Sequence, residues 1–295
     1  MNTSAAVRPR VVLVDGVPMS GLVAEAADPR AVIVAIHGGA STAAYFDCPG
    51  LPRLSMLRTG ATLGFTVVAL DRPGYGSSAP YPDAVAQPEQ RVALAYGAID
   101  KMVTDSQPGR FLLAHSAGCE LAVRMAADQR GDDLLGIALA GTGLEYDDAA
   151  REILKTATPT KRPVGLRDLL WQPAHLYPAE VLNGITNSST GAPYEAAMVN
   201  TWARQDFPRL AGEVHVPVQF SVAEYERVWK SDPESLAKIA ALFTAAPRFV
   251  LNEQVGAGHN ISLSVNAAAY HMKVLSFVEE CVVERENAIA KLEAG

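Results

Sequence analysis

The chain has 295 residues, of which 49% are hydrophobic, and its formal net charge at pH 7 is −7. A chain of this length and composition can bury a sizeable core, as one large domain or two small ones. The acidic balance disfavours nucleic acid or an anionic membrane as the main partner, because either would require concentrated Lys and Arg.

Three widely spaced cysteines occur, Cys48, Cys119 and Cys281. An odd number at such spacings fits neither a disulfide framework nor a thiolate metal site, so a reducing compartment is favoured. The first ten residues lack the apolar segment of a secretory signal, and no later segment offers about 18 uninterrupted apolar residues. We therefore expect a cytoplasmic, soluble protein that acts on a small molecule, as a monomer or a homodimer.

The chain begins with predicted strands. Residues 11–14 and 19–26, joined by the turn Asp15-Gly16, predict a hairpin, and the apolar run 31–36 predicts a buried strand. Helices and strands then alternate, which predicts βαβ units and a parallel sheet. The expected elements are a helix at 51–63, a strand at 65–70, a helix at 88–104, a strand at 111–113, a helix after residue 116, and a strand at 134–140.

The next comparable strand, at 216–222, starts only after a long stretch rich in Pro, Trp and Tyr. We interpret residues 143–213 as a helical cap inserted after the sixth strand. Residues 1–142 and 214–295 then form one core domain. A helix at 233–245, a strand at 248–254 and a terminal helix from about residue 262 complete the pattern.

A serine between small residues interrupts the apolar run that starts at Phe111, in the sequence Ala114-His115-Ser116-Ala117-Gly118. The predicted strand ends there and helical spacing follows, so the hydroxyl lies on a tight strand-to-helix turn. Backbone N–H groups at the start of the helix point toward any negative charge that develops beside it. Ser116 is therefore the predicted nucleophile.

Glycines directly follow the predicted strand at 31–36, in His37-Gly38-Gly39-Ala40. Glycine lets backbone N–H groups approach a bound oxygen closely. We expect the N–H of Gly39 or Ala40 to form one half of an oxyanion hole and the N–H of Ala117 to form the other. A plain glycine turn that joins the strand to a helix is the alternative.

A histidine follows the last predicted strand, in Gly256-Ala257-Gly258-His259-Asn260, which we interpret as a flexible loop. Imidazole can take a serine proton at neutral pH and return it to a leaving group. Ligands of parallel sheets bind at the carboxyl ends of strands, where this loop lies. We expect His259 to be the general base, with an ordinary surface histidine as the alternative.

Two glutamates follow the strand predicted at 216–222, and we prefer Glu226 over Glu224 as the carboxylate that holds the imidazole. The order Ser116, Glu226, His259 is that of nucleophile, acid and base. A solvated charge is the alternative for either glutamate. No metal-ligand spacing or phosphate-binding loop competes with this set, so neither a metal nor an organic cofactor is expected.

Together these motifs resemble the α/β-hydrolase superfamily, in its capped, serine-nucleophile form that includes esterases and C–C hydrolases. The resemblance covers nearly the whole chain. It implies an α/β-hydrolase fold, with a mostly parallel central sheet flanked by helices. It also implies that residues 71–78 shape the pocket floor and support the nucleophile turn. The matching segments are His37-Gly38-Gly39, Asp71-Arg72-Pro73-Gly74-Tyr75-Gly76-Ser77-Ser78, the turn at Ser116, and Gly258-His259.

Two positions depart from the family pattern. Ala114 replaces the first glycine of the nucleophile motif, which is sterically mild, and glutamate stands where the family more often has aspartate. Some family members take the acid from the strand before the cap. Glu145 and Asp147 are therefore further candidates for the acid.

The resemblance and the motifs predict hydrolysis of an ester or related acyl bond through an acyl-enzyme. A cofactor-independent C–C hydrolase or lyase, or a ligand-binding or receptor protein with vestigial turnover, are the alternatives. Aromatic residues in the predicted cap indicate a small to medium apolar or aromatic substrate, unless they only pack the cap onto the core. The expected substrate-binding residues are Trp171, Tyr177, Tyr194, Met198 and Trp202.

Overall fold

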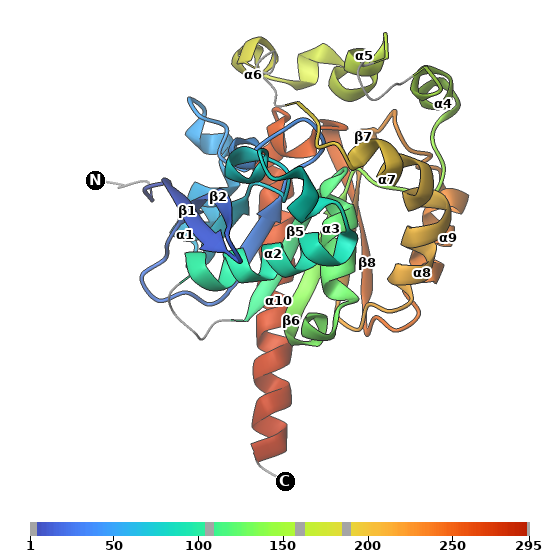
Figure 1. Ribbon diagram of the computed structural model, residues 1–295. Helices are drawn as coiled ribbons and strands as arrows, with labels where there is room; N and C mark the ends of the chain where they lie inside the picture. The colour runs from blue at the N-terminus through green and yellow to red at the C-terminus, as the bar shows by residue number, and fades with distance from the viewer. Residues whose placement is uncertain (1–4, 104–108, 157–162, 185–189, 294–295) are drawn as a thin grey trace.

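An eight-stranded sheet runs through the middle of the computed structural model, which describes residues 5–103, 109–156, 163–184 and 190–293. The strand order is β1-β2-β4-β3-β5-β6-β7-β8 (Figure 1). β1 pairs with β2, and β2 with β4, in antiparallel fashion, and all later pairs are parallel. The strands are β1 (Arg8–Val14), β2 (Val17–Ala24), β3 (Val32–Ile36), β4 (Thr66–Leu70), β5 (Arg110–His115), β6 (Leu134–Ala140), β7 (Val218–Tyr225) and β8 (Phe249–Gly258).

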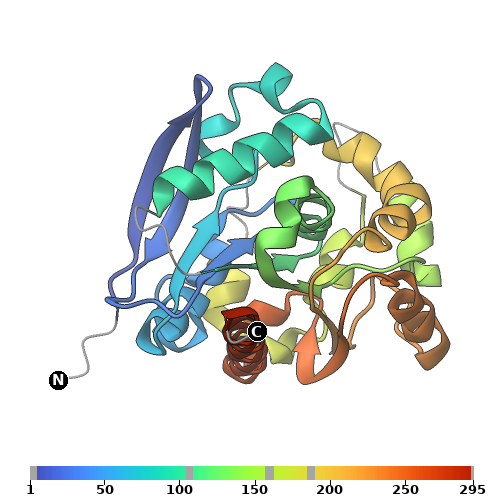
Figure 2. The same cartoon turned by 90° about the horizontal axis from the view of Figure 1, so that it is seen from below.

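Helices cover both faces of the sheet, as the view along it in Figure 2 shows. α2 (Pro88–Met102), α3 (Gly118–Ala126) and α9 (Pro233–Leu242) contribute to an apolar cluster on one face. α1 (Met56–Thr62) and α10 (Ala267–Glu293) contribute to the cluster on the other. Strands covered on both faces are apolar throughout, because neither side meets water.

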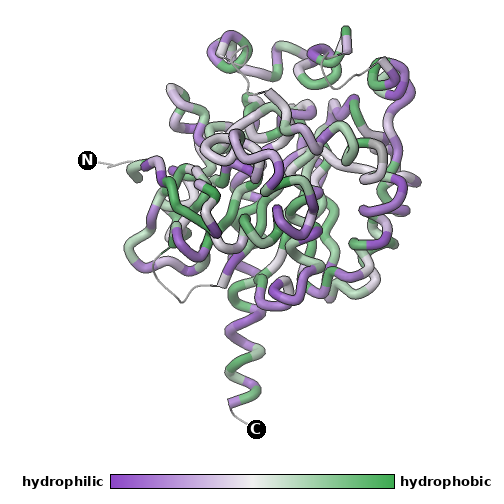
Figure 3. The backbone as a smooth tube through the Cα atoms, in the orientation of Figure 1, coloured by the Kyte–Doolittle hydropathy of each residue, from purple (hydrophilic) through white to green (hydrophobic). Residues whose placement is uncertain are grey.

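That pattern is visible along the chain in Figure 3, where apolar residues gather in the middle of the molecule, whereas polar and apolar residues alternate along the projecting end of α10. β3, β4 and β6 are buried at every position. These strands lie within one residue of the predicted ranges. The predicted parallel sheet is confirmed.

Local sequence explains where several elements start and stop. Asp15 and Gly16 both have positive φ, 48° and 81°, as the tight turn of the predicted hairpin requires. The helix predicted at 51–63 is two elements, a 3₁₀ turn at Pro52–Leu54 and then α1. Ser55 separates them, because its side chain accepts the N–H of Arg58 and caps α1.

The ends of several elements differ from the predictions. β8 continues through Gly258 and pairs with β7 up to Tyr225, so the flexible loop predicted before His259 is wrong. β7 and β8 pair again after a register shift, and this pairing extends both strands. The amino-acid composition of the two segments does not reveal such a shift. The terminal helix begins at Ala267, after a 3₁₀ turn at Ile261–Leu263. The helix predicted at 88–104 ends at Met102, and Thr104 lies outside the described residues.

The described residues between β6 and β7 are largely helical. We refer to residues 143–213 as the insertion. Its α-helices are α4 (Asp148–Leu154), α5 (Leu166–Trp171), α6 (Ala179–Gly184), α7 (Glu195–Thr201) and α8 (Phe207–Ala211). Figure 1 shows the helices labelled α4, α5 and α6 above the carboxyl ends of the parallel strands. The end of α10 lies at the opposite side of the molecule.

Gly118 opens α3 where two backbone segments approach closely. A Cβ at this position would lie 2.5 Å from the carbonyl oxygens of both Ile36 and His37. Backbone atoms cannot rotate away, so we expect Gly118→Ala to lower the free energy of unfolding by about 1–3 kcal/mol or more. Urea denaturation measures this. Gly184→Ala is the control, because Gly184 is also helical and a Cβ there would face open space. Equal urea midpoints for the two variants would contradict the prediction.

Candidate active site

Ser116 lies on the turn between β5 and α3, at the carboxyl edge of the sheet. Its φ is +52°, a left-handed backbone conformation that residues other than glycine rarely adopt. The Ser116 N–H donates to the carbonyl of Ala140, with 2.8 Å between the heavy atoms. Gly38 makes room beside it, since a Cβ there would lie 3.1 Å from the Ser116 Cβ. The turn thus holds a partly exposed hydroxyl in a strained, fixed position.

A continuous chain of hydrogen bonds links this hydroxyl to a buried carboxylate. His259 Nε2 lies 3.1 Å from Ser116 Oγ. His259 Nδ1 lies 2.9 Å and 3.0 Å from the two carboxylate oxygens of Glu226. The side chains of His259 and Glu226 are 1% and 4% exposed. The three residues that directly follow β5, β7 and β8 therefore meet at one edge of the sheet.

The surroundings keep Glu226 ionised. Burial alone would raise the pKa of Glu226, but the His259 ring and backbone donors outweigh it, so this pKa lies below its usual value. One of those donors is the Val228 N–H, at 2.8 Å. An ionised Glu226 only accepts hydrogen bonds, so the His259 proton belongs on Nδ1. Nε2 is then free to accept the Ser116 hydroxyl proton.

The other candidate acids have different partners. A Glu224 carboxylate oxygen accepts the Gly256 N–H at 2.8 Å and thereby joins β7 to β8. Glu145 pairs with Lys230 at 3.0 Å at the surface, and Asp147 accepts the Ala149 N–H at the start of α4. Of the four candidates, Glu226 alone has a contact with the His259 ring among those described.

His115, the residue before Ser116, supports the backbone of His259. Its Nε2 lies 2.8 Å from the carbonyl oxygen of His259, and its ring stacks on Tyr45 with 4.7 Å between centroids. Burial lowers the pKa of His115 to about 3, so the ring is neutral at pH 7. The nearby carbonyl requires the proton on Nε2, which donates to His259. His115 thus fixes the segment that carries the imidazole.

The backbone segments that the sequence predicts to form an oxyanion hole lie beside the serine. Ala117 stands at the N-terminus of α3, and a Cβ on Gly39 would lie 3.8 Å from the Ala117 Cβ. The N–H of Ala40 donates to the Tyr75 hydroxyl at 3.0 Å. That bond engages Ala40 and favours Gly39 as the partner of Ala117.

The five residues expected to bind substrate lie in two groups. Tyr194, Met198 and Trp202 pack in the apolar cluster on the α2 and α3 face. Trp171 and Tyr177 form the second group, with an edge-to-face ring contact at 5.1 Å. The Tyr177 hydroxyl accepts the backbone N–H of Asn260, next to His259, at 3.3 Å.

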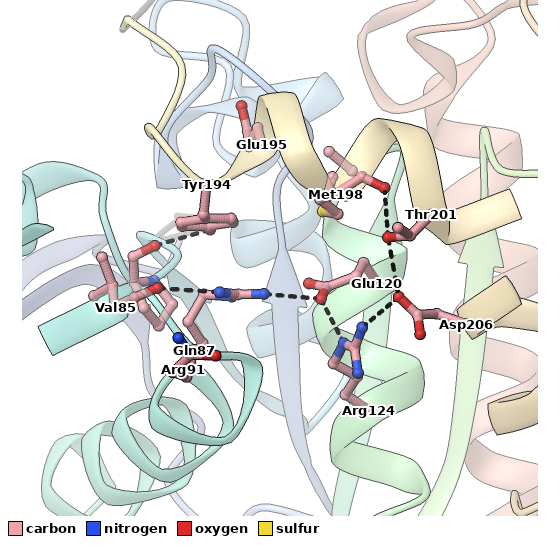
Figure 4. Close-up of polar contacts among 12 residues, drawn as sticks. Val85, Gln87, Arg91, Glu120, Arg124, Tyr194, Glu195, Met198, Thr201 and Asp206 are labelled. Carbon is pink, nitrogen blue, oxygen red and sulfur yellow. Dashed lines mark hydrogen bonds and ion pairs between the residues drawn. The ribbon is translucent and has the colours of Figure 1, made fainter. Parts of the chain in front are cut away.

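Charged side chains fasten the second half of the insertion to the core (Figure 4). On α3, Glu120 is buried and accepts hydrogen bonds from Arg91 at 3.1 Å and from Arg124 at 2.5 Å. Arg124 also pairs with Asp206 of the insertion at 2.9 Å. The Tyr194 ring lies over the Arg91 guanidinium, 4.0 Å from ring centroid to Cζ. We call these contacts the α3 anchor.

A second set of residues near the serine was not predicted individually. Arg72 is fully buried, and its guanidinium contacts the Glu195 carboxylate on α7 as well as the carbonyl oxygens of Gly38 and Ala117. The family resemblance implies a structural role for residues 71–78 as a group. Glu195 carries no local signal, because its partner is 123 residues away in the chain.

Across the described ranges, no group of three or more His, Cys, Asp or Glu side chains is arranged to hold a metal ion. None of the helices in these ranges is both long and apolar enough to cross a membrane.

Comparison with known proteins supports the architecture. The model of a family described as "Alpha/beta hydrolase family" matches residues 33–270. No curated protein sequence matches the chain. A carboxyl esterase from Bacillus coagulans is a similar structure, with a TM-score of 0.68 and 14% identity over 94% of this chain and 99% of the esterase.

Two further structures are similar. A monoglyceride lipase from Saccharomyces cerevisiae has a TM-score of 0.68 and 14% identity over 95% of this chain and 96% of the lipase. An epoxide hydrolase from Vigna radiata has a TM-score of 0.65 and 16% identity over 93% of this chain and 98% of the hydrolase. At these sequence identities the structural likeness shows the fold alone.

Proposed function

The chain belongs to the alpha/beta hydrolase family, and from the geometry of its site we propose that it is a serine hydrolase that cleaves an ester or a related acyl bond. One observation carries this proposal. The Ser116 hydroxyl, both nitrogens of His259 and the Glu226 carboxylate form one hydrogen-bonded chain. That arrangement activates a serine for attack on a carbonyl carbon.

In the proposed mechanism, the Ser116 oxygen attacks the carbonyl carbon while its proton passes to His259 Nε2. The carbonyl oxygen becomes an oxyanion, held by the N–H groups of Ala117 and Gly39. His259 then gives the proton to the leaving group, and an acyl-enzyme forms. Water attacks the acyl-enzyme while His259 takes a proton from it, and His259 then returns that proton to the Ser116 oxygen as the bond to the acyl group breaks and the carboxylic acid leaves. Glu226 remains ionised and stabilises the imidazolium in both halves of the reaction.

The substrate proposed is a small to medium apolar or aromatic ester, and the insertion is proposed to be the cap that encloses it. Met198 and Trp202 belong to the large apolar cluster against which Ala117, next to the serine, packs. Both side chains are more than nine-tenths buried. Apolar side chains near a reactive hydroxyl favour an apolar acyl or leaving group over a charged one.

A fluorophosphonate probe tests the proposal, because it reacts with serines that a neighbouring base activates. Intact-protein mass is expected to show one adduct on the parent chain and none on His259→Ala. His215→Ala removes an exposed histidine away from the site and should react like the parent. A folded parent that forms no adduct would contradict the serine hydrolase and favour a lyase or a ligand-binding protein.

A further inference from the structure

A buried ion pair joins the insertion to the loop after β4. Arg72 in this loop is completely buried, and the Glu195 carboxylate that it contacts is 14% exposed. Burial opposes the charge of the guanidinium, but Tyr194 and Glu195 outweigh it and raise the pKa of Arg72 above its usual value. Arg72 is therefore a permanent buried cation, and the charge that balances it comes from α7 of the insertion.

Arg72 also holds one peptide unit of the proposed oxyanion hole. Its Nη2 donates to the Gly38 carbonyl oxygen at 3.1 Å, and His37 Nδ1 lies 2.7 Å from the same oxygen. Because His37 Nε2 accepts the Arg72 backbone N–H, the His37 proton is on Nδ1 and donates to Gly38. Burial and the Arg72 charge lower the pKa of His37, so its ring is neutral. Two donors thus fix the carbonyl of the peptide whose N–H belongs to Gly39.

This arrangement acts on the Gly39 N–H. Donors at a carbonyl oxygen hold the plane of the peptide and make the N–H on its other side more polar. Oxyanion stabilisation depends on donors that are already oriented before the charge develops. Arg72 Nη1 also reaches the Ala117 carbonyl at 3.5 Å, so one guanidinium contacts both backbone segments of the proposed hole.

Glu195 lies on the same side of the site. Its Oε2 is 3.6 Å from where a Cβ on Gly39 would lie. Burial and the nearby Glu195 carboxylate raise the pKa of the Tyr75 hydroxyl, which accepts the Ala40 N–H. In Figure 4 the Glu195 side chain is directed away from the α3 anchor, although Tyr194 and Asp206 of that anchor belong to the same half of the insertion. Its contacts are therefore with the backbone of the proposed hole and its supports.

We propose that Glu195 is a positioning residue that, through Arg72, sets the Gly38–Gly39 peptide of the oxyanion hole and so couples the docking of α7 to transition-state stabilisation. This inference rests on the serine hydrolase function proposed above. Glu195 does not touch the reacting atoms in this scheme. Its loss lowers the rate of the chemical steps and leaves substrate binding unchanged.

The test is steady-state hydrolysis of p-nitrophenyl butyrate by Glu195→Gln. We expect kcat to fall about 10- to 100-fold, with KM within about twofold of the parent, because an oxyanion donor acts mainly in the transition state. Glu195→Asp keeps the charge and should recover part of kcat. Asp206→Asn makes the same change of carboxylate to amide in the α3 anchor, and should keep kcat within about twofold.

Three outcomes would overturn the inference. An unchanged kcat in Glu195→Gln removes the role, and a raised KM with unchanged kcat makes Glu195 a substrate contact. An equal loss in Asp206→Asn means that docking of the insertion in general is responsible. Should Glu195→Gln fail to fold, Glu195→Asp carries the test, and parental kcat despite its shorter reach would count against the positioning role.

The rate of fluorophosphonate labelling separates this inference from the function on which it rests. If the parent reacts and Glu195→Gln reacts equally fast, only the positioning role is lost. If the folded parent forms no adduct, the serine hydrolase proposal fails, and this inference fails with it. The expected result is one adduct on each protein, formed more slowly on Glu195→Gln.

Discussion

Ser116→Ala is expected to lower kcat for ester hydrolysis by about 10⁴- to 10⁶-fold. The substitution removes the nucleophilic oxygen and leaves the backbone donors beside it in place. Both serine and alanine are strained equally at a φ of +52°, so the free energy of unfolding should change little. The expected result is an inactive protein with parental stability.

Initial rates on p-nitrophenyl butyrate and thermal unfolding measure the two halves of this prediction. Ser235→Ala is the matched control, because its hydroxyl contacts Asp232 at the exposed start of α9, and it should hydrolyse ester like the parent. Turnover by Ser116→Ala above about 1% of the parental rate would exclude Ser116 as the nucleophile.

Glu226→Gln is expected to lower kcat by about 10³- to 10⁴-fold. The amide has nearly the shape of the carboxylate but can present an N–H toward His259 Nδ1. His259 would then carry its proton on Nε2, where it faces Ser116 Oγ, 3.1 Å away in the parent, and could not accept the serine proton. The lost imidazolium stabilisation adds to this effect.

Two neighbouring carboxylates provide controls for that substitution. Glu224→Gln changes the same residue type two positions earlier, and Glu145→Gln changes a surface carboxylate paired with Lys230. Both should keep kcat within about threefold of the parent, in line with the small effect of most surface changes. A larger loss in either one than in Glu226→Gln would move the acid to that residue.

Acid denaturation tests the lowered pKa of Glu226 independently of catalytic activity. Its pKa in the folded protein lies below its usual value, so the unfolded chain binds its proton more readily. Glu226 therefore stabilises the fold above the usual glutamate pKa, and this contribution is lost as the pH falls through the lowered pKa. Glu226→Gln should lose less stability than the parent over that range.

The order of the elements could be predicted from the sequence because each central strand is covered on both faces. β3, β4 and β6 are uninterrupted apolar segments separated by turns or helical spacing, and such segments have few alternatives in an alternating chain. The ends of β7 and β8 could not be predicted. Their extension depends on pairing between Tyr225 and Gly258, which is set by tertiary structure.

The candidate site could be predicted where short motifs carry it. Ser116, His259 and Glu226 each follow a predicted strand, and topology alone brings the ends of parallel strands together. Arg72 and Glu195 could not be paired this way, since α7 lies in the insertion and its packing follows no short motif. Ala40 and Gly39 are equivalent in sequence terms, and only the contact with Tyr75 separates them.

The long terminal helix offers a place to attach the protein to a solid support or to a second enzyme. α10 has 27 residues, which corresponds to about 40 Å of helix, and it ends on the side of the molecule opposite the insertion (Figure 1). A resin or a fused second enzyme joined beyond Glu293 would sit behind the sheet, separated from it by the projecting turns of the helix. Substrate would then reach the proposed nucleophile Ser116 from open solution, without diffusing through the support.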